Sequence, residues 1–318
     1  MTILKTKNQS TPRHFLSILD LTPEEILTIC SRSKEIKEQN SLGVISNYQP
    51  LKNKTIAMIF EKPSLRTRVS FEVAIRNLGG SCIYLSQQEI GLGSRESISN
   101  ITKVLSRYVD AIIYRTFAHS NLQEMASIST IPVINALSDL EHPCQTLADL
   151  LTILEHKGKL TDLNISYIGD GNNVANSLAL GVLSCGSNFS IANPVNFGLQ
   201  NQILEKIHEI LKQSKNIFIQ SSNPDEILPE CDIIYTDVWT SMGKENEHEK
   251  NLLVFKDFQI NELRIKKMKP DSLFMHPMPA HDNEEISEGL LDHPQSIVFD
   301  QAENRLHAQQ ALLETFIV

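Results

Sequence analysis

This 318-residue chain has little cysteine, a single tryptophan and no long hydrophobic run. Its five cysteines are odd in number and scattered, and none forms a Cys-x-x-Cys pair: Cys30, Cys82, Cys144, Cys185 and Cys231. This pattern argues against a structural zinc site and fits reduced thiols in a cytoplasm. Residues 1–5 lack the apolar core of a signal peptide, and no apolar stretch approaches the roughly 20 residues that span a membrane. We therefore expect a cytoplasmic protein with no membrane partner.

An excess of positive charge is also missing. The net charge is −9 with a pI near 5.6, which argues against nucleic acid or an anionic membrane as the main partner. The composition, 41% hydrophobic and 21% charged, is that of a soluble globular protein. Arginines nevertheless gather locally, which suggests a small anionic ligand: Arg66, Arg68, Arg76, Arg95 and Arg115.

Apolar strands and amphipathic helices alternate along the chain, in two series. Strands are predicted at 55–60, 81–86, 110–115 and 132–137, then at 164–169, 188–193, 216–220, 232–238 and 271–276, with a short last one at 296–300. Helices are predicted near 66–78, 96–108, 119–129, 144–157 and 302–317, and residues 22–25 cap an earlier one. Such alternation predicts an α/β fold of two doubly wound parallel sheets, joined by helices, with a ligand cleft between them.

The predicted domains divide the chain into three parts. Residues 1–145 form the first domain and residues 146–300 the second, and residues 301–318 form a helix that returns to the first domain. Ligands of such sheets bind beyond the carboxyl ends of the strands, and the polar clusters described next all fall there.

The most informative cluster is Ser-Leu-Arg-Thr-Arg at 64–68, between a buried strand and a helix. Free N–H groups and the positive dipole end of a helix start favour an oxyanion, and arginine adds a bidentate fork. An ordinary cap with solvated arginines is the alternative, but the second hydroxyl, Thr67, favours a phosphate or carboxylate cradle.

Further polar residues follow other strands. Arg115 ends the third strand, and His142 and Gln145 lie on one side of a helix start, where they can offer a donor and an acceptor to one carbonyl or amide. Cys144 beside them lacks an evident base and orienting partner, so a nucleophilic role is disfavoured. Asp237, ahead of a small polar loop, can bind an ammonium group.

Two further motifs are weaker indications. Residues 169–174, Gly-Asp-Gly-Asn-Asn-Val, follow a strand as a dinucleotide fingerprint would, but Val174 replaces the third glycine and Asn193 stands where an NAD enzyme has an acid. His276 and His281 flank a stiff Pro-Met-Pro turn in which one X-Pro bond can be cis, and their spacing does not suit helical metal ligands.

Together these clusters resemble the aspartate/ornithine carbamoyltransferase family over essentially the whole chain, and its ornithine branch most closely. Residues 64–68 resemble the carbamoyl-phosphate motif, and residues 142–145 resemble the carbamoyl-binding motif. Asp237 with Ser-Met-Gly at 241–243 resembles the loop of the ornithine branch, and residues 302–307 resemble the final helix, whose arginine turns back into the site.

The chain departs from the family pattern at three positions. Leu65 replaces a threonine, which matters little if the position contributes its backbone N–H. Gly91 stands where a glutamine reaches a neighbouring subunit, so Arg95 becomes the expected donor across that interface. Pro277 and Met278 replace the Cys-Leu of ornithine enzymes, and His-Pro at this place is typical of the aspartate branch.

The resemblance implies carbamoyl transfer from carbamoyl phosphate to the δ-amine of L-ornithine, giving L-citrulline, with no metal or organic cofactor. It assigns carbamoyl-phosphate binding to Ser64, Leu65, Arg66, Thr67, Arg115, His142, Gln145, Pro277, Met278 and Arg305. Among these, Arg66, Arg115, His142, the Pro277 backbone and Arg305 are the expected catalytic groups. Asn173, Asp237, Ser241 and Met242 are expected to bind ornithine, and a homotrimer or a multiple of it is implied.

Three other functions stay open at this point: a dehydrogenase, an aspartate-type carbamoyltransferase and a non-catalytic relative that binds a ligand or partner. The incomplete glycine pattern disfavours the first and the 241–243 loop the second, while Pro277 and Gly91 keep the third open. Whether the reaction makes or degrades citrulline in the cell is not determined by the sequence.

Overall fold

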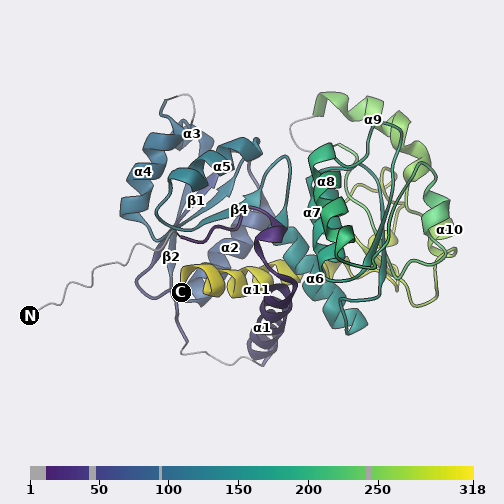
Figure 1. The fold of residues 1–318 in the computed structure, drawn as a ribbon, viewed down its shortest axis with the longest axis horizontal. Coiled ribbons are helices and arrows are strands. Elements are labelled where there is room, and N and C mark those ends of the chain that lie inside the picture. The colour runs from purple at the N-terminus through teal and green to yellow at the C-terminus, as the bar shows by residue number, and fades with distance from the viewer. Residues whose placement is uncertain (1–11, 43–47, 93–94, 241–244) are drawn as a thin grey trace, which may run out of the picture.

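Two α/β lobes lie side by side in the computed structural model, which describes residues 12–42, 48–92, 95–240 and 245–318 (Figure 1). Both sheets are entirely parallel, which confirms the predicted fold class. None of the described helices is long and apolar enough to cross a membrane.

The first sheet has the strand order β2-β1-β3-β4. Its strands are β1 (Thr55–Phe60), β2 (Ser81–Ser86), β3 (Ala111–Arg115) and β4 (Val133–Leu137). Phe15 extends this sheet by one bridge, because its backbone exchanges hydrogen bonds with Val133 and Asn135 on β4. The helices of this lobe are α1 (Pro23–Ser41), α2 (Leu65–Asn77), α3 (Gln87–Ile90), α4 (Ile98–Tyr108) and α5 (His119–Ile128), with a short 3₁₀ turn, η1 (Ile18–Asp20).

The second sheet has the order β7-β6-β5-β8-β9. Its strands are β5 (Asn164–Ile168), β6 (Asn188–Ala192), β7 (Phe218–Ser221), β8 (Ile233–Tyr235) and β9 (Leu273–Met275). The helices are α7 (Asn173–Ser184), α8 (Asn201–Lys212), α9 (His248–Phe255) and α10 (Glu262–Ile265), with 3₁₀ turns η2 (Pro224–Ile227), η3 (Glu245–Glu247), η4 (Lys256–Phe258) and η5 (Leu290–Asp292).

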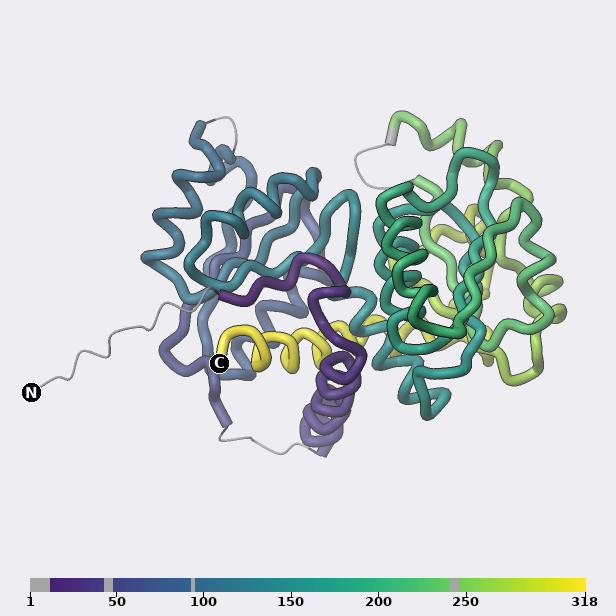
Figure 2. Tube along the Cα trace, viewed as in Figure 1, coloured from purple at the N-terminus to yellow at the C-terminus, as the bar shows by residue number. Residues whose placement is uncertain are grey.

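Two helices join the lobes. α6 (Pro143–Lys157) packs on α1, α7 and α11, and its first eleven residues are all buried. α11 (Val298–Ile317) begins beside the second sheet and runs along α1 and α2 under the first lobe (Figure 2). One hydrophobic cluster therefore runs through both lobes, from Phe71 on α2 to Tyr235 on β8.

The strand expected at 296–300 is wrong. Residues around it form a single bridge, Ser296 with Phe274, and α11 begins at Val298. The Gln301 N–H donates to the Ile297 carbonyl and so starts the helical hydrogen-bond pattern, which leaves no second strand partner for this apolar run.

Each sheet changes winding direction at one place, β1/β3 in the first and β5/β8 in the second. Outside the carboxyl ends of such strand pairs, the following loops diverge to opposite sides and leave room for a ligand. The start of α2 and Arg115 lie at the first of these points, and the start of α7 and Asp237 lie at the second.

Candidate functional site

The start of α2 is a built cap rather than an open turn. Ser64 has an extended backbone, and its hydroxyl accepts from the Thr67 N–H at 3.4 Å and donates to the Thr67 hydroxyl at 3.0 Å. Leu65, the first helical residue, is 75% exposed, which fits a backbone role at this position.

Three guanidinium groups lie close enough to influence one another. Burial, followed by the nearby Arg305 and Arg66, lowers the pKa of Arg115 to about 9. Burial also lowers the pKa of Arg305 and that of half-buried Arg66. In the part of the chain that the structure describes, none of the three is ion-paired with a carboxylate. An incoming anion would relieve both the repulsion and the desolvation.

Arg68, the second arginine of the same motif, does not join this group. Its guanidinium pairs with Glu72 at 2.7 Å and lies 3.9 Å from the centre of the Tyr84 ring, at the surface. Helical geometry explains the difference, because residues two apart lie on opposite sides of a helix.

Arg305 returns from α11 to connect the two helix starts. Its Nη1 donates to Gln145 Oε1 at 2.6 Å, and its Nη2 donates to the Thr67 hydroxyl at 3.3 Å. Behind them, the Asp149 carboxylate accepts from Gln145, Gln301 and Tyr235. Burial raises the pKa of Asp149 to about 6 despite these donors. The buried network holds Arg305 and Gln145 in fixed positions.

His142 is buried directly before α6 and lies among cations. Burial and then Arg305, Arg115 and Lys62 hold its pKa well below the ordinary value, so its imidazole is neutral at pH 7. Its Nδ1 atom has no hydrogen-bond partner among the described residues, and its backbone N–H donates to Ser177 at 2.9 Å. A neutral imidazole still has one N–H group, so it can donate a hydrogen bond to a ligand at this site without adding a further positive charge.

The second switch point carries a carboxylate. Asp237 is 8% exposed, and its Oδ2 accepts from Asn172 Nδ2 at 2.8 Å, across the gap between β5 and β8. Burial raises the pKa of Asp237, and the nearby His276 opposes that rise. Asn173, expected to contact ornithine, donates one N–H of its Nδ2 to the Ser138 carbonyl at 2.6 Å, which leaves its Oδ1 and the second N–H for a ligand.

The turn after β9 is rigidly held. His276 Nδ1 accepts from the Met278 N–H at 3.1 Å, so Nε2 carries the ring proton and donates to Glu285 at 3.1 Å. The Glu285 carboxylate also accepts from the His281 N–H, and the Met278–Pro279 bond is cis. Both Pro277 and Met278 are half-buried, with their backbone in this fixed turn.

Glu285 also belongs to a group of potential metal ligands with His281 and Glu284, whose ligand atoms lie within 4.8 Å of one another. Because Glu285 Oε1 already accepts two hydrogen bonds inside the turn, we assign this group a structural role.

Two of the expected ornithine residues, Ser241 and Met242, lie outside the described residues. Arg95 is exposed, and among the described residues no hydrogen bond or ion pair joins it to the site residues above. Gly91 adopts φ +61°, and a Cβ there would lie 2.6 Å from Arg95 Cβ, so this tight turn excludes the side chain that the family places at position 91.

The Gly-Asp-Gly turn after β5 packs closely against the backbone of residues 197–199. A Cβ on Gly171 would lie 2.3 Å from the Gly198 backbone, and the Gly171 N–H donates to the Phe197 carbonyl. This glycine therefore serves close backbone packing rather than the approach of a pyrophosphate, which removes the basis of the dehydrogenase alternative.

Sequence reasoning missed Asp149, Gln301, Asn172 as a partner of Asp237, and Lys62. Asp149 follows Gln145 by four residues and Gln301 precedes Arg305 by four, so helical spacing alone placed each beside an expected site residue. No comparable signal pointed to Lys62, whose ammonium lies 4.6 Å from the centre of the Phe117 ring.

The structure is thus a two-lobed α/β protein with charged sites of opposite sign at its two switch points. The first, the anion corner, holds Ser64, Arg66 and Arg115, and the second, the acidic corner, holds Asp237. Two family models match the chain: the "Aspartate/ornithine carbamoyltransferase, carbamoyl-P binding domain" over residues 13–155, and the "Asp/Orn binding domain" over residues 161–316. The chain belongs to the aspartate/ornithine carbamoyltransferase family, as its motifs indicated.

The individual relatives described next are all named ornithine carbamoyltransferase, and so belong to the ornithine branch of the family. The ornithine carbamoyltransferase of Anoxybacillus flavithermus is 45% identical over 305 residues, covering 96% of each chain. That of Archaeoglobus fulgidus is 47% identical over 301 residues, covering 95% of this chain and 96% of the other. The solved structure of ornithine carbamoyltransferase from Pyrococcus furiosus matches with a TM-score of 0.92 and 43% identity over 96% of this chain and 97% of that one.

Proposed function

We propose that this chain is an ornithine carbamoyltransferase, which transfers the carbamoyl group of carbamoyl phosphate to the δ-amine of L-ornithine and releases L-citrulline and phosphate. The observation that carries the proposal is the group of three arginines, Arg66, Arg115 and Arg305, which have no carboxylate partner among the described residues and lie beside a neutral, buried His142. Relatives named ornithine carbamoyltransferase, at 44–47% identity over nearly the whole chain, support it.

On the phosphate side, the dianion is bound by the Leu65 N–H group, by Ser64 and Thr67, and by the guanidinium groups of Arg66 and Arg115. A helix N-terminus with two guanidinium forks provides charge and direction together. Burial removes water from the Arg115 guanidinium and so lowers its pKa. A bound dianion stabilises the charge in place of that water, so the pKa rises again and the anion is bound more tightly.

The carbonyl oxygen of the carbamoyl group faces Thr67, Arg115 and His142. Negative charge grows on this oxygen as the amine attacks, and each pre-positioned donor of this kind is commonly worth about 10²–10³ in rate. Gln145, fixed by Arg305 and Asp149, and the backbone carbonyls of Pro277 and Met278 accept from the carbamoyl NH₂ group.

The amino-acid side of the reaction belongs to the second lobe. Asp237 faces the α-ammonium group of ornithine, and Asn173, Ser241 and Met242 complete this half. The neutral δ-amine forms the new C–N bond, and the C–O bond to phosphate breaks with its electron pair on the phosphate oxygen. The δ-ammonium group of free ornithine has a pKa near 10.4, like that of lysine, and loses one proton to solvent to become this neutral amine. The second proton, which leaves the nitrogen after the C–N bond has formed, is taken by the departing phosphate.

The finer parts of the proposal concern assembly and location. We propose a cytoplasmic homotrimer or a multiple of it, in which Arg95 reaches the phosphate of a neighbouring subunit. Mixed trimers of Arg66→Ala and Arg95→Ala subunits would then recover part of the activity, and no recovery would remove Arg95 from the neighbouring site. The relatives include proteins named anabolic and proteins named catabolic.

One assay tests the main proposal. Purified protein is incubated with carbamoyl phosphate and either ornithine or aspartate, and the products are identified by mass spectrometry. We expect citrulline from ornithine and no carbamoyl-aspartate. Carbamoyl-aspartate as the main product would assign the chain to the other branch, and no product from either amine would support a non-catalytic relative.

A further inference from the structure

We propose that Glu141 is a positioning residue for His142, which it holds in place through the Ser177 hydroxyl. The inference rests on the proposed function, in which His142 donates to the carbamoyl oxygen. Glu141 lies in the turn between β4 and α6, directly before His142, and was not among the residues expected from the sequence.

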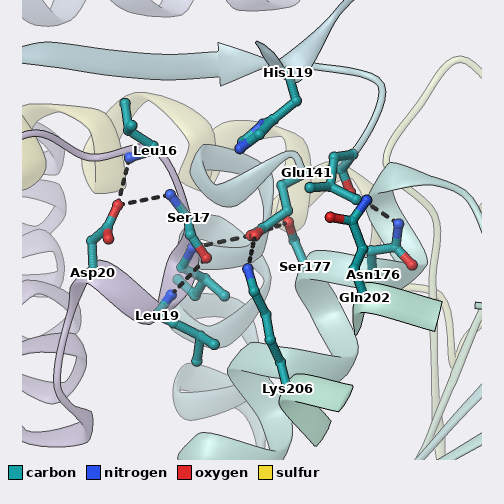
Figure 3. A network of polar contacts seen from close by, with 12 residues as sticks. Leu16, Ser17, Leu19, Asp20, His119, Glu141, Asn176, Ser177, Gln202 and Lys206 are labelled. Atoms are coloured by element: carbon teal, nitrogen blue, oxygen red, sulfur yellow. Dashed lines mark hydrogen bonds and ion pairs between the residues drawn. The ribbon is translucent and has the colours of Figure 1, made fainter. Parts of the chain in front are cut away.

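Glu141 is fully buried, yet its carboxylate joins elements of both lobes (Figure 3). Its Oε2 accepts from the Ile18 N–H in η1 at 3.2 Å and from the Ser177 hydroxyl on α7 at 3.1 Å. Its Oε1 lies 3.5 Å from the Lys206 ammonium on α8, the side chain of which is 39% exposed. Burying a carboxylate costs several kcal/mol unless its partners repay it, so an ordinary interior position would favour an apolar residue.

The Ser177 hydroxyl transmits the effect of this carboxylate. A hydroxyl has one hydrogen, and this one is directed to Glu141. The lone pairs of the oxygen are therefore available to the His142 N–H, which donates to it at 2.9 Å. Without the carboxylate, the Ser177 hydroxyl could rotate and point its hydrogen toward the His142 N–H. Two hydrogens would then face each other, and this hydrogen bond would be lost.

The same turn is held at two more points by α7. Asn173 donates to the Ser138 carbonyl at 2.6 Å, and Asn176 donates to the Leu140 carbonyl at 2.9 Å. Three side chains of one second-lobe helix thus hold the turn that carries His142, and Glu141 connects this contact to η1 and α8. A small rotation of the turn would move the His142 imidazole relative to the carbamoyl oxygen. A misplacement of about 1 Å at such a donor can cost about 10²-fold in rate.

The test compares Ser177→Ala with Ser187→Ala. Ser187 is also buried in the second lobe and also makes two hydrogen bonds, accepting from the Leu163 N–H and donating to the Leu160 carbonyl. Both of its partners are backbone groups outside the turn, whereas Ser177 donates to the Glu141 carboxylate. We expect Ser177→Ala to lower kcat about 10-fold with KM for ornithine within about 2-fold, and Ser187→Ala to leave kcat unchanged at an equal loss of Tm.

Glu141→Gln and the double variant Glu141→Gln/Ser177→Ala complete the cycle. If both residues act through one path, the double variant loses no more kcat than Ser177→Ala alone, whereas independent effects multiply. Hydrogen exchange of the peptide covering residues 138–142 provides a readout that does not depend on turnover, and it should speed up in Glu141→Gln and Ser177→Ala but not in Ser187→Ala.

Faster exchange with unchanged kcat, unchanged exchange, or multiplied losses in the double variant would each overturn the assignment. A wild-type chain that binds carbamoyl phosphate but makes no citrulline would overturn the proposed function instead, and this inference with it.

Discussion

The two switch points, where the sheets change winding direction, carry charged side chains of opposite sign. They also differ in whether these side chains already have a polar partner before a ligand binds. In the first lobe, Arg66 and Arg115 have no carboxylate partner among the described residues, and burial lowers the pKa of both. In the second lobe, Asp237 already accepts from Asn172. The first corner therefore gains more from its ligand than the second, and we expect carbamoyl phosphate to bind before ornithine.

The comparison also shows that the position of a binding site in the fold does not determine the sign of the charge that its side chains carry. Both corners lie beyond the carboxyl ends of the strands at which the sheet reverses direction, and both use a helix that begins directly after the strand. The residues at these equivalent places decide whether an anion or a cation is bound.

The largest expected effect tests the anion corner with a matched pair of arginines on α2. Arg66→Ala removes a half-buried guanidinium that forms no ion pair within the described part of the chain, and it should lower kcat/KM by about 10³-fold or more. Arg68→Ala removes an exposed guanidinium that is already paired with Glu72, and kcat/KM should change by less than about 3-fold. Steady-state kinetics with carbamoyl phosphate as the varied substrate measures both.

Near-normal kcat/KM in Arg66→Ala would contradict the placement of the phosphate. Equal losses in both variants would mean that net positive charge, rather than the position of one guanidinium, governs binding.

The acidic corner is tested by Asp237→Asn, which keeps the size of the side chain and removes its charge. We expect kcat/KM for ornithine to fall by about 10²-fold, the range for truncating one partner of a buried charge pair. Affinity for carbamoyl phosphate, measured by calorimetry, should stay unchanged. Asp225→Asn, at an ion pair with Lys267 on the surface, is the control. Loss of carbamoyl-phosphate binding in Asp237→Asn would instead make Asp237 a structural residue.

A smaller effect concerns stability and the network behind both corners. The pKa of Asp149 is about 6 in the folded protein against an ordinary 3.8, so the folded state binds this proton more tightly. The resulting stabilisation is complete below pH 3.8 and is lost as the pH rises through about 6. A difference of this size corresponds to about 3 kcal/mol or less.

Asp149→Asn removes this proton site and keeps the shape. Its free energy of unfolding relative to wild type should increase between pH 4 and pH 7, as measured by urea denaturation at each pH. A constant difference over this range would show that Asp149 keeps its charge when buried, held by its neighbours.

The smallest expected effect is that of Pro277→Cys. Proline keeps the backbone carbonyl that accepts from the carbamoyl NH₂ group, and the turn is already fixed by the His276–Met278 hydrogen bond. We expect kcat to change by much less than the roughly 10²-fold that a new proton-transfer group would bring. A gain of that size would show that the native turn is impaired and would revive the non-catalytic alternative.

Most of the fold followed from the sequence because buried parallel strands and capped helices have local signatures. The capping box of Thr22 and Glu25 forms as expected, and β1 matches its predicted bounds. The error at 296–300 arose because an apolar run of strand length is also the first turn of a buried helix.

The candidate site was less predictable, since it depends on contacts between distant segments. The links from Arg305 to Thr67 and from Glu141 to Ile18 span more than a hundred residues, and no local pattern encodes them. Arg68 illustrates the opposite difficulty: the motif contains two arginines, and only the helix geometry separates the one at the site from the one at the surface.

The burial of the thiols has a consequence for how the protein meets oxidants. Cys30, Cys144, Cys185 and Cys231 are buried, and burial raises the pKa of each, so almost no thiolate forms at neutral pH. With proline at position 277, the turn beside the reacting groups carries no thiol at that position either. Thiol-alkylating reagents should therefore reach only Cys82, which is half-buried on an edge strand of the first sheet and whose pKa burial also raises, so we expect a slow reaction there that leaves the catalytic groups untouched.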